Sequence, residues 1–351
     1  MSPTQETFII GRDERILITG ASGFIAGRLV QNLLDRGFRK IRCLVRPSSR
    51  TAGLAALQNR SGGAELEIIQ GNLLSAEDCR EITREVAVVY HLAAARGEKS
   101  FPDAFLNSVV TTRNLLEACT ASDGLKRFVS ISSFAVYRNQ RRRLTESGLL
   151  EESPDGRGEP YCFAKVRQDQ VVREYAQKFG LPCVLVRPGY VFGPGNLGIS
   201  GRVGIGTFGV FLHLGGSNRI PLTYVDNCAD AIALAGLTPG VDGEVFNIVD
   251  DDLPTSRQFL RLYKRNARRF PSLYLPHGCS YLLCCLLEWY SKWSQGQLPA
   301  IMSRSKWRAY WKKTSYSNEK AKSLLHWEPR VPMQEAFAHY FKSCREEVKV
   351  A

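Results

Sequence analysis

The chain has 351 residues, of which 44% are hydrophobic, and a formal net charge of +13. A chain of this length can bury a large core, and it has no apolar run of the roughly twenty residues that a membrane-spanning helix requires. Its ten cysteines form no CxxC pair and no Cys/His cluster with metal-ligand spacing, so no metal site is expected. The first residues are polar and lack a signal-peptide pattern, which together with the scattered cysteines predicts a reduced, cytoplasmic protein.

The strongest local pattern is an apolar run at residues 15–19 that leads into a glycine-rich turn and then into an amphipathic helix pattern. Gly20 permits the tight turn, and Gly23 leaves room for the backbone to approach a pyrophosphate. Ala26 is the third small residue, and it allows the helix to pack closely on the strand. The N-terminus of that helix offers unpaired N–H groups to phosphate oxygens. In this strand–turn–helix context the glycines predict a dinucleotide site, whereas alone they would indicate only a tight turn.

Strand patterns and helix patterns alternate through the first half of the chain. The strand patterns cover residues 41–45, 66–70, 86–92, 128–132 and 183–187, and the two strong helix patterns cover 105–119 and 161–179. This alternation predicts an α/β fold, a Rossmann-type doubly wound parallel sheet with helices on both faces. We expect residues 1–190 to form this dinucleotide-binding domain, with a later strand and helix from about 220–250. Ligands of such sheets bind at the carboxyl ends of the strands.

After Pro188 the pattern loosens, and residues 191–351 are expected to form a smaller, mostly helical cap that binds the substrate. Between Arg257 and Lys313 there are twelve Lys and Arg residues and one acid, Glu288. Such a charge excess either faces an anionic ligand or surface, or simply keeps the segment solvated.

Tyr161 and Lys165 lie four residues apart in the second helix pattern and therefore on one face of it. A phenol ordinarily has a pKa of about 10, and a neighbouring ammonium lowers this pKa by stabilising the phenolate. The pair can therefore exchange a proton with an alcohol or carbonyl oxygen. Ser132 and Ser133 come at the end of a strand pattern, where a hydroxyl can orient the same oxygen. Taken singly, these residues also fit an ordinary surface pair and turn-forming serines.

Motifs spread over most of the chain resemble those of the extended short-chain dehydrogenases/reductases, the NAD-dependent epimerase/dehydratase superfamily. They occupy residues 19–26, 71–73, 91–94, 107, 114–118, 132–133, 136–137, 161–165, 187–195 and 224–227. The resemblance implies a Rossmann domain, a bound NAD(P) and an enzymatic activity on a small molecule. A non-enzymatic relative is disfavoured, because Tyr161 and Lys165 are both present.

The resemblance also implies catalytic roles for four residues. Tyr161 would be the general acid/base, and Lys165 would bind the nicotinamide ribose and lower the pKa of Tyr161. Ser133, four residues before Tyr137, would be the catalytic hydroxyl, and Asn107 would support the proton relay.

The cofactor contacts that the resemblance implies include Tyr161 and Lys165. The others are Thr19, Gly20, Ser22, Gly23, Phe24, Ile25, Arg46, Asn72, Leu73, Ala93, Ala94 and Pro188. Asn72 stands where many relatives have an aspartate, and Ala26 where they have a third glycine. An acid after the second strand suits the ribose 2′-hydroxyl of NAD, and a basic residue suits the 2′-phosphate of NADP. Residues 46–50 contain two arginines and no acid, which favours NADP over NAD, although arginines also stack on adenine without a 2′-phosphate.

Two substrate classes stay open, and both reactions begin with hydride and proton transfer at a secondary alcohol or ketone carbon. The first is a hydrophobic, steroid-like alcohol or ketone, because residues 316–331 resemble the 3β-hydroxysteroid dehydrogenase branch. Arg46 favours this class. The alternative is a sugar nucleotide, converted by an epimerase or dehydratase. Arg219, seven residues before Asp226, matches the spacing of an arginine that clamps a diphosphate, and Tyr190 is a second expected substrate contact.

Residues 273–313 carry the remaining predictions about partners. Leu282, Leu286, Trp289 and Trp293 follow helical spacing among the basic residues. They either lie at the periphery of an anionic membrane, line an apolar pocket, or belong to a core helix of the cap. A homodimer is a further expectation. Nucleic-acid binding is not expected, because no recognised module surrounds the basic residues.

Overall fold

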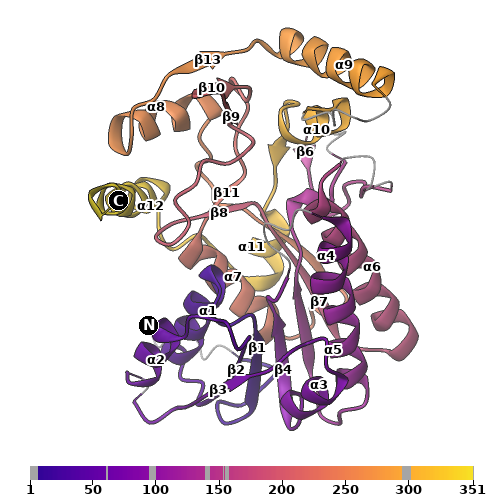
Figure 1. Cartoon of the computed structure of the whole chain (residues 1–351). Coiled ribbons are helices and arrows are strands. Elements are labelled where there is room, and N and C mark those ends of the chain that lie inside the picture. The colour runs from indigo at the N-terminus through magenta and orange to yellow at the C-terminus, as the bar shows by residue number, and fades with distance from the viewer. Residues whose placement is uncertain are drawn as a thin grey trace.

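The computed structural model describes residues 7–60, 62–94, 100–138, 143–152, 154, 158–294 and 302–350. Its central layer is a seven-stranded sheet with helices on both faces, and a cap of smaller elements lies above one end of the sheet (Figure 1). The strands of the sheet are β1 (Arg15–Thr19), β2 (Lys40–Val45), β3 (Glu65–Gln70), β4 (Val86–His91), β5 (Arg127–Ile131), β7 (Cys183–Pro188) and β12 (Val245–Ile248). The helices beside it are α1 (Phe24–Asp35), α2 (Ala52–Gln58), α3 (Ala76–Ile82), α4 (Phe101–Ala104), α5 (Thr111–Thr120), α6 (Pro160–Phe179), α7 (Val225–Leu237) and α11 (Glu319–Leu325).

The strand order is β3–β2–β1–β4–β5–β7–β12, and every neighbouring pair is parallel. The order changes direction between β1 and β4, and doubly wound sheets bind their ligands at such a switch point. The predicted Rossmann-type fold is confirmed. The predicted strands agree closely with the observed ones, because strands buried on both faces are continuous apolar runs.

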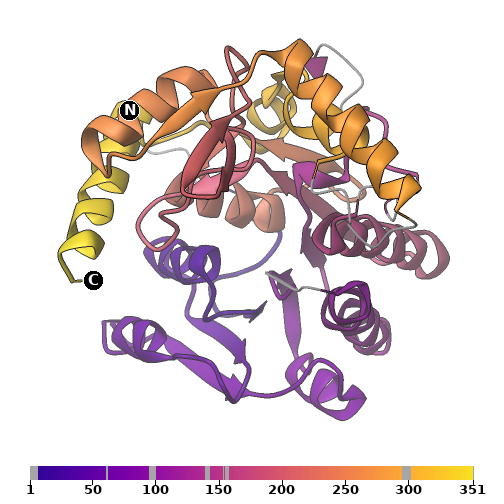
Figure 2. The same ribbon diagram turned by 45° about the horizontal axis from the view of Figure 1, so that its top comes forward.

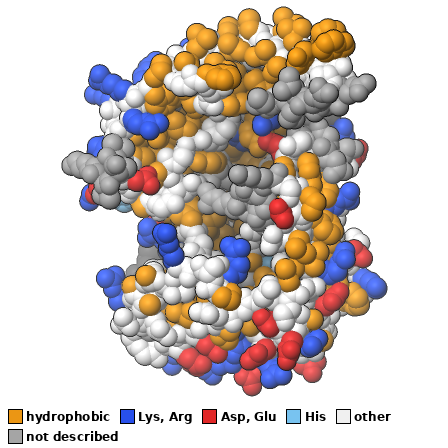
Figure 3. All heavy atoms as spheres, in the orientation of Figure 1, with side chains coloured by type: hydrophobic (Ala, Val, Ile, Leu, Met, Phe, Trp, Pro, Cys, Tyr) orange, Lys and Arg blue, Asp and Glu red, His pale blue; other side chains and the backbone are white. Residues whose placement is uncertain are grey.

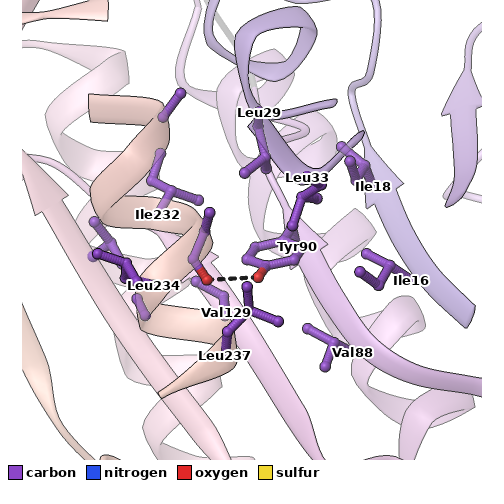
Figure 4. Packing of buried hydrophobic residues seen from close by; sticks show 14 of the residues in the cluster. Ile16, Ile18, Leu29, Leu33, Val88, Tyr90, Val129, Ile232, Leu234 and Leu237 are labelled. Atoms are coloured by element: carbon purple, nitrogen blue, oxygen red, sulfur yellow. Dashed lines mark hydrogen bonds between the residues drawn. The ribbon is translucent and has the colours of Figure 1, made fainter. Parts of the chain in front are cut away.

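One face of the sheet is covered by α1 and α7, which pack on each other and on the apolar strand residues. Tyr90 projects from β4 into this cluster, and its Oη donates a hydrogen bond of 2.8 Å to the carbonyl oxygen of Ala233 (Figure 4). Gly236 allows this approach, because a Cβ there would lie 2.3 Å from Tyr90 Oη. Trp327, which follows α11, is buried in the same cluster, so this part of the chain returns from the cap to the sheet.

The opposite face is covered by α3, α5 and α6. The helix predicted over residues 105–119 is interrupted there: a π-helical turn, η1 (Phe105–Val110), separates α4 from α5. The prediction of one continuous helix relied on a constant period of about 3.6 residues per turn, and a π-helical turn departs from this period. Single π-helical turns are frequent at functional sites.

The cap is mostly helical, and Figure 2 shows its helices curving around a small sheet. Its elements are β8 (Tyr190–Phe192), β9 (Gly204–Thr207), β10 (Val210–His213), β11 (Leu222–Tyr224), α8 (Ser256–Asn266), β13 (Ser272–Tyr274), α9 (His277–Trp293), α10 (Arg304–Tyr310) and α12 (Met333–Val350). The small sheet consists of β9, β10 and β13, and β8 pairs with β11. Two short strands, β6 (Arg143–Leu144) and β14 (Ser315–Tyr316), connect the cap to the segment after β5.

Candidate functional site

The glycine-rich turn lies where the ends of β1, β2 and β4 meet. Gly20 has a φ of +68°, and a Cβ at this position would lie 2.9 Å from the backbone of Ala93. Glycine alone meets both conditions without strain. Ala21 N–H donates to Leu44 O at 3.2 Å, and Ala93 N–H donates to Thr19 Oγ1 at 3.3 Å.

Helix α1 begins directly after this turn, and its N-terminus is open. Its N-cap residue is Gly23, so no side chain of that residue caps the first N–H groups of the helix, and the first helical turn contains no acid. Ser22 and Gly23 are exposed, and Phe24 and Ile25 are half-buried. Unpaired N–H groups at the positive end of a helix dipole are a binding site for phosphate. The turn and the helix therefore fit the pyrophosphate of a dinucleotide.

The segments after β2 and β3 border this turn. Arg46 follows β2 directly and is exposed, as is Arg50, and residues 46–50 contain no acid. Asn72 N–H donates to Asp78 Oδ2 at 2.7 Å, and its own side-chain oxygen accepts from Leu74 N–H at 3.0 Å. The side-chain oxygen of Asn72 thus shapes a tight turn. Leu73 beside it is buried.

The start of α6 packs on the segment that follows β5. Cys162 Sγ donates to the carbonyl oxygen of Ala135, two residues after Ser133, at 3.2 Å. Tyr161, in the first turn of α6, is 40% exposed and therefore accessible to a ligand. Ser133 is half-buried, whereas Ser132 is buried and its Oγ has no hydrogen-bond partner among the residues that the structure describes. Ser133 is therefore the more accessible of the two hydroxyls.

The same end of α6 also contacts the π-helical turn. The ring of Phe163 lies 5.4 Å from that of Phe101 and 6.2 Å from that of Phe105. Asn107 lies in this turn, and its Nδ2 donates to Asp103 O at 2.9 Å, one turn earlier in the helix. The segments that carry Asn107, Ser133 and Tyr161 are thus in contact at one edge of the sheet.

Lys165 is buried at the carboxyl end of β5. Its Nζ donates to Ile131 O at 2.6 Å and to Gln168 Oε1 at 2.8 Å. Burial lowers the pKa of Lys165 to about 8. The ammonium is thus charged at neutral pH, with only a small margin.

A buried series of hydrogen bonds that no sequence motif predicts continues from Gln168 to the glycine-rich turn. Gln168 Nε2 donates to Thr112 Oγ1 at 2.8 Å, which also lies 2.8 Å from His91 Nε2. His91 Nδ1 in turn lies 2.8 Å from Thr19 Oγ1. His91 belongs to the motif at residues 91–94, whereas nothing in the sequence marks Thr112 or Gln168.

The direction of these bonds determines the tautomer of His91. Thr112 Oγ1 donates its own proton to Ser108 O, so it accepts from His91 Nε2–H, and His91 Nδ1 accepts from Thr19 Oγ1–H. Burial lowers the pKa of His91 to about 3, which keeps the imidazole neutral. This series of hydrogen bonds therefore orients Lys165 through uncharged side chains, those of Gln168, Thr112 and His91.

The other predicted contacts lie on neighbouring loops and in the cap. Ala93 and Ala94 are half-buried after β4, and Pro188 is buried at the end of β7. Tyr190 Oη donates to Gly198 O at 2.9 Å. Arg219 is exposed in the cap, where its backbone pairs with that of Thr255 at the start of α8.

Within the described ranges, no group of His, Cys, Asp and Glu side chains could hold a metal ion. All ten cysteines are free thiols. None of the described helices is long and apolar enough to cross a membrane.

A family model described as the NAD dependent epimerase/dehydratase family matches residues 16–248. The chain belongs to this family. The match covers β1 to β12 and thus the glycine-rich turn and all four predicted catalytic residues. Residues 316–331, which carry the resemblance to the 3β-hydroxysteroid dehydrogenase branch, lie outside it.

Curated relatives include both a sugar-nucleotide enzyme and a reductase of another kind of substrate. A trifunctional UDP-glucose 4,6-dehydratase/UDP-4-keto-6-deoxy-D-glucose 3,5-epimerase/UDP-4-keto-L-rhamnose-reductase of Arabidopsis thaliana is 28% identical over 255 residues, which are 68% of this chain and 37% of that protein. A 2-alkyl-3-oxoalkanoate reductase of Stenotrophomonas maltophilia is 29% identical over 238 residues, covering 64% of this chain and 67% of that protein. The chain spans only 36–37% of the length of the trifunctional plant relatives.

Solved structures share the fold. UDP-glucuronic acid 4-epimerase from Bacillus cereus, in complex with NAD, matches with a TM-score of 0.70 and 21% identity over 95% of this chain and 99% of that one.

Proposed function

We propose that the chain is an NAD(P)-dependent oxidoreductase of the epimerase/dehydratase type, acting at a secondary alcohol or ketone carbon of a sugar nucleotide. The proposal rests on the observation that two features lie together at the carboxyl ends of the parallel strands. One is the glycine-rich turn with the open N-terminus of α1, and the other is Lys165 beside the segments of Tyr161 and Ser133. Membership of the family supports the chemistry, and the UDP-sugar enzymes among the relatives support the substrate class.

The pyrophosphate of the dinucleotide would be held by Gly20, Gly23 and the first N–H groups of α1, because this helix N-terminus has no side-chain cap. Bound NAD(P) supplies the acceptor or donor of a hydride. Tyr161 would move the proton at the substrate oxygen, the Lys165 ammonium would stabilise its phenolate, and Ser133 would orient the same oxygen. Asn107 would support this relay. Arg219 and Tyr190 are the proposed substrate contacts.

A second candidate function is reduction of a hydrophobic ketone. It is favoured by Arg46, which stands after β2 where an acid would suit an NAD that is recycled in place. The 2-alkyl-3-oxoalkanoate reductase among the relatives supports the same class.

A substrate screen distinguishes the two candidates. The full chain is incubated with NAD or NADP and either UDP-sugars or steroid-like alcohols, while nicotinamide absorbance and the products are both followed. An epimerase or dehydratase changes the sugar nucleotide without net cofactor turnover. Net NAD(P)H formation with the alcohols, together with unchanged UDP-sugars, would refute the first candidate in favour of the second.

We also propose that the chain prefers NADP to NAD, with Arg46 binding the 2′-phosphate. Arg46→Asp should then weaken NADP binding about tenfold or more relative to NAD, because it replaces an attractive charge by a repulsive one. Cofactor titration by fluorescence measures both affinities. Arg60→Asp is the matched control, because Arg60 is also exposed but lies far from Arg46. Arg60 follows α2, and Gln58 of this helix contacts the start of β3, whereas Arg46 follows the carboxyl end of β2 at the opposite end of the sheet. An unchanged NADP/NAD ratio in Arg46→Asp would exclude this role.

The hydrogen bond from Lys165 to Gln168 predicts a change in the pH profile. Because Lys165 must be charged, turnover should fall as the pH rises through about 8, the lowered pKa of this group. Gln168→Leu removes an acceptor that stabilises the ammonium, so the fall should move about one pH unit lower, and Gln168→Glu should move it higher. Gln170→Leu, on the exposed side of α6, should leave the profile unchanged. Identical profiles in all three variants would contradict a positioning role for Gln168.

A further inference from the structure

Helix α9 has one face packed on the cap and one face open to solvent. Ser280 and Cys284 are buried on the inner face, and Leu283 and Leu287 pack against the cap cluster around Trp311. The outer face carries the four apolar residues with helical spacing. Leu282 is 61% exposed, Leu286 54%, Trp289 65% and Trp293 70%. These exposed side chains do not belong to a core helix of the cap, which corrects that sequence-based alternative.

Two neighbouring elements extend this apolar surface. Leu273 and Tyr274 in β13, just before α9, are 56% and 42% exposed. Phe208, at the tip of the β9–β10 hairpin, is fully exposed, and this hairpin pairs with β13. In the orientation shared by Figures 1 and 3, hydrophobic side chains gather across the top of the molecule, over β13 and α9. Monomeric proteins rarely expose contiguous apolar patches of this kind without a partner.

Basic residues adjoin the apolar surface. Arg261, Arg265, Arg268 and Arg269, from α8 and the segment after it, are exposed, and Lys292 lies in α9 itself. Figure 3 shows blue side chains beside the apolar top, on the side of α8. Glu288, the one acid between residues 257 and 313, is paired with Arg304 at 2.5 Å. The surface thus combines an apolar face with a strong positive charge.

We propose that this surface, formed by α9, β13 and the β9–β10 tip, docks the protein onto an anionic lipid bilayer. Aromatic and aliphatic side chains would enter the headgroup region, while the arginines contact lipid phosphates. The charge argues against a second copy of this chain as the occupant, because a symmetric contact would bring two positive surfaces together. The proposal does not depend on the substrate of the enzyme.

Co-sedimentation of the full chain with vesicles tests the proposal. Vesicles of phosphatidylcholine with phosphatidylglycerol should bind the protein at low salt and less at high salt, whereas phosphatidylcholine alone should bind it poorly. The triple variant Leu282→Ser/Leu286→Ser/Trp293→Ser should bind at least about tenfold more weakly. A matched control, Leu149→Ser/Leu324→Ser/Phe179→Ser, removes the same kinds of exposed side chain elsewhere and should bind like the original.

A conservative variant gives a readout that does not depend on the triple variant folding. Brominated lipid should quench the tryptophan fluorescence of the original protein. Trp289→Phe/Trp293→Phe keeps the face apolar, so it should still bind the vesicles but lose most of the quenching. The proposal would be overturned if binding to the vesicles were not salt-sensitive, or if the triple variant bound as well as the original protein. It would also be overturned if light scattering showed a dimer without lipid that becomes monomeric in the triple variant.

Discussion

Tyr161→Phe is expected to lower turnover by roughly 10²–10⁴-fold while cofactor affinity changes little. The change removes only the phenolic hydroxyl, in the first turn of α6, where the ring is 40% exposed and the backbone is held by its helix. Lys165, one turn later, keeps its bonds to Ile131 and Gln168, so the site should otherwise stay intact. Turnover with the substrate found in the screen and cofactor titration measure the two quantities.

The matched control is Tyr175→Phe on the same helix. Tyr175 Oη donates to Glu117 Oε1 at 3.0 Å, about four turns along α6 from Tyr161, so this variant loses a hydroxyl that the proposed chemistry does not use. Its turnover should remain close to that of the original protein. Full activity of Tyr161→Phe would remove the tyrosine from the proposed mechanism, whatever the substrate.

Arg187→Met is expected to destabilise the fold by about 3–5 kcal/mol, because it leaves a buried carboxylate without its counter-charge. Arg187 Nη2 lies 2.8 Å from Asp169 Oδ2, and both side chains are almost completely buried. Arg187 Nη1 also donates to Tyr137 Oη at 2.9 Å, and Tyr137 Oη donates to Asn247 Oδ1 at 2.7 Å. The cluster holds α6 against β7 and β12, so it fixes the helix that carries Tyr161 and Lys165.

Urea denaturation followed by circular dichroism measures this loss. Lys322→Met is the exposed counterpart: it breaks an ion pair of 2.7 Å with Asp251 and should cost less than about 1 kcal/mol. Asp169→Leu/Arg187→Met removes both charges and should recover much of the stability lost by Arg187→Met alone. If Arg187→Met and Lys322→Met were equally mild, the buried pair would not hold α6 in place.

Local patterns were sufficient to predict the parallel sheet and the glycine-rich turn. The tight turn at Gly20 is predicted correctly because a positive φ is a local constraint, whereas the close approach of the Ala93 backbone to Gly20 comes from the tertiary structure. Most strands are predicted with similar accuracy, because strands buried on both faces, such as β4 and β7, are largely apolar runs. The π-helical turn at residues 105–110 escaped the sequence analysis because it changes the helical period without a distinctive residue.

The sequence by itself therefore determined the fold class, the glycine turn and the residue types available for proton transfer, because these depend on neighbours along the chain. Only the tertiary structure connected Lys165 to the turn, because the bonds through Thr112 join residues 21 and 56 positions apart. It likewise decided which face of α9 is exposed. Helical spacing identifies an apolar stripe, but whether that stripe meets a core or solvent depends on where the helix packs.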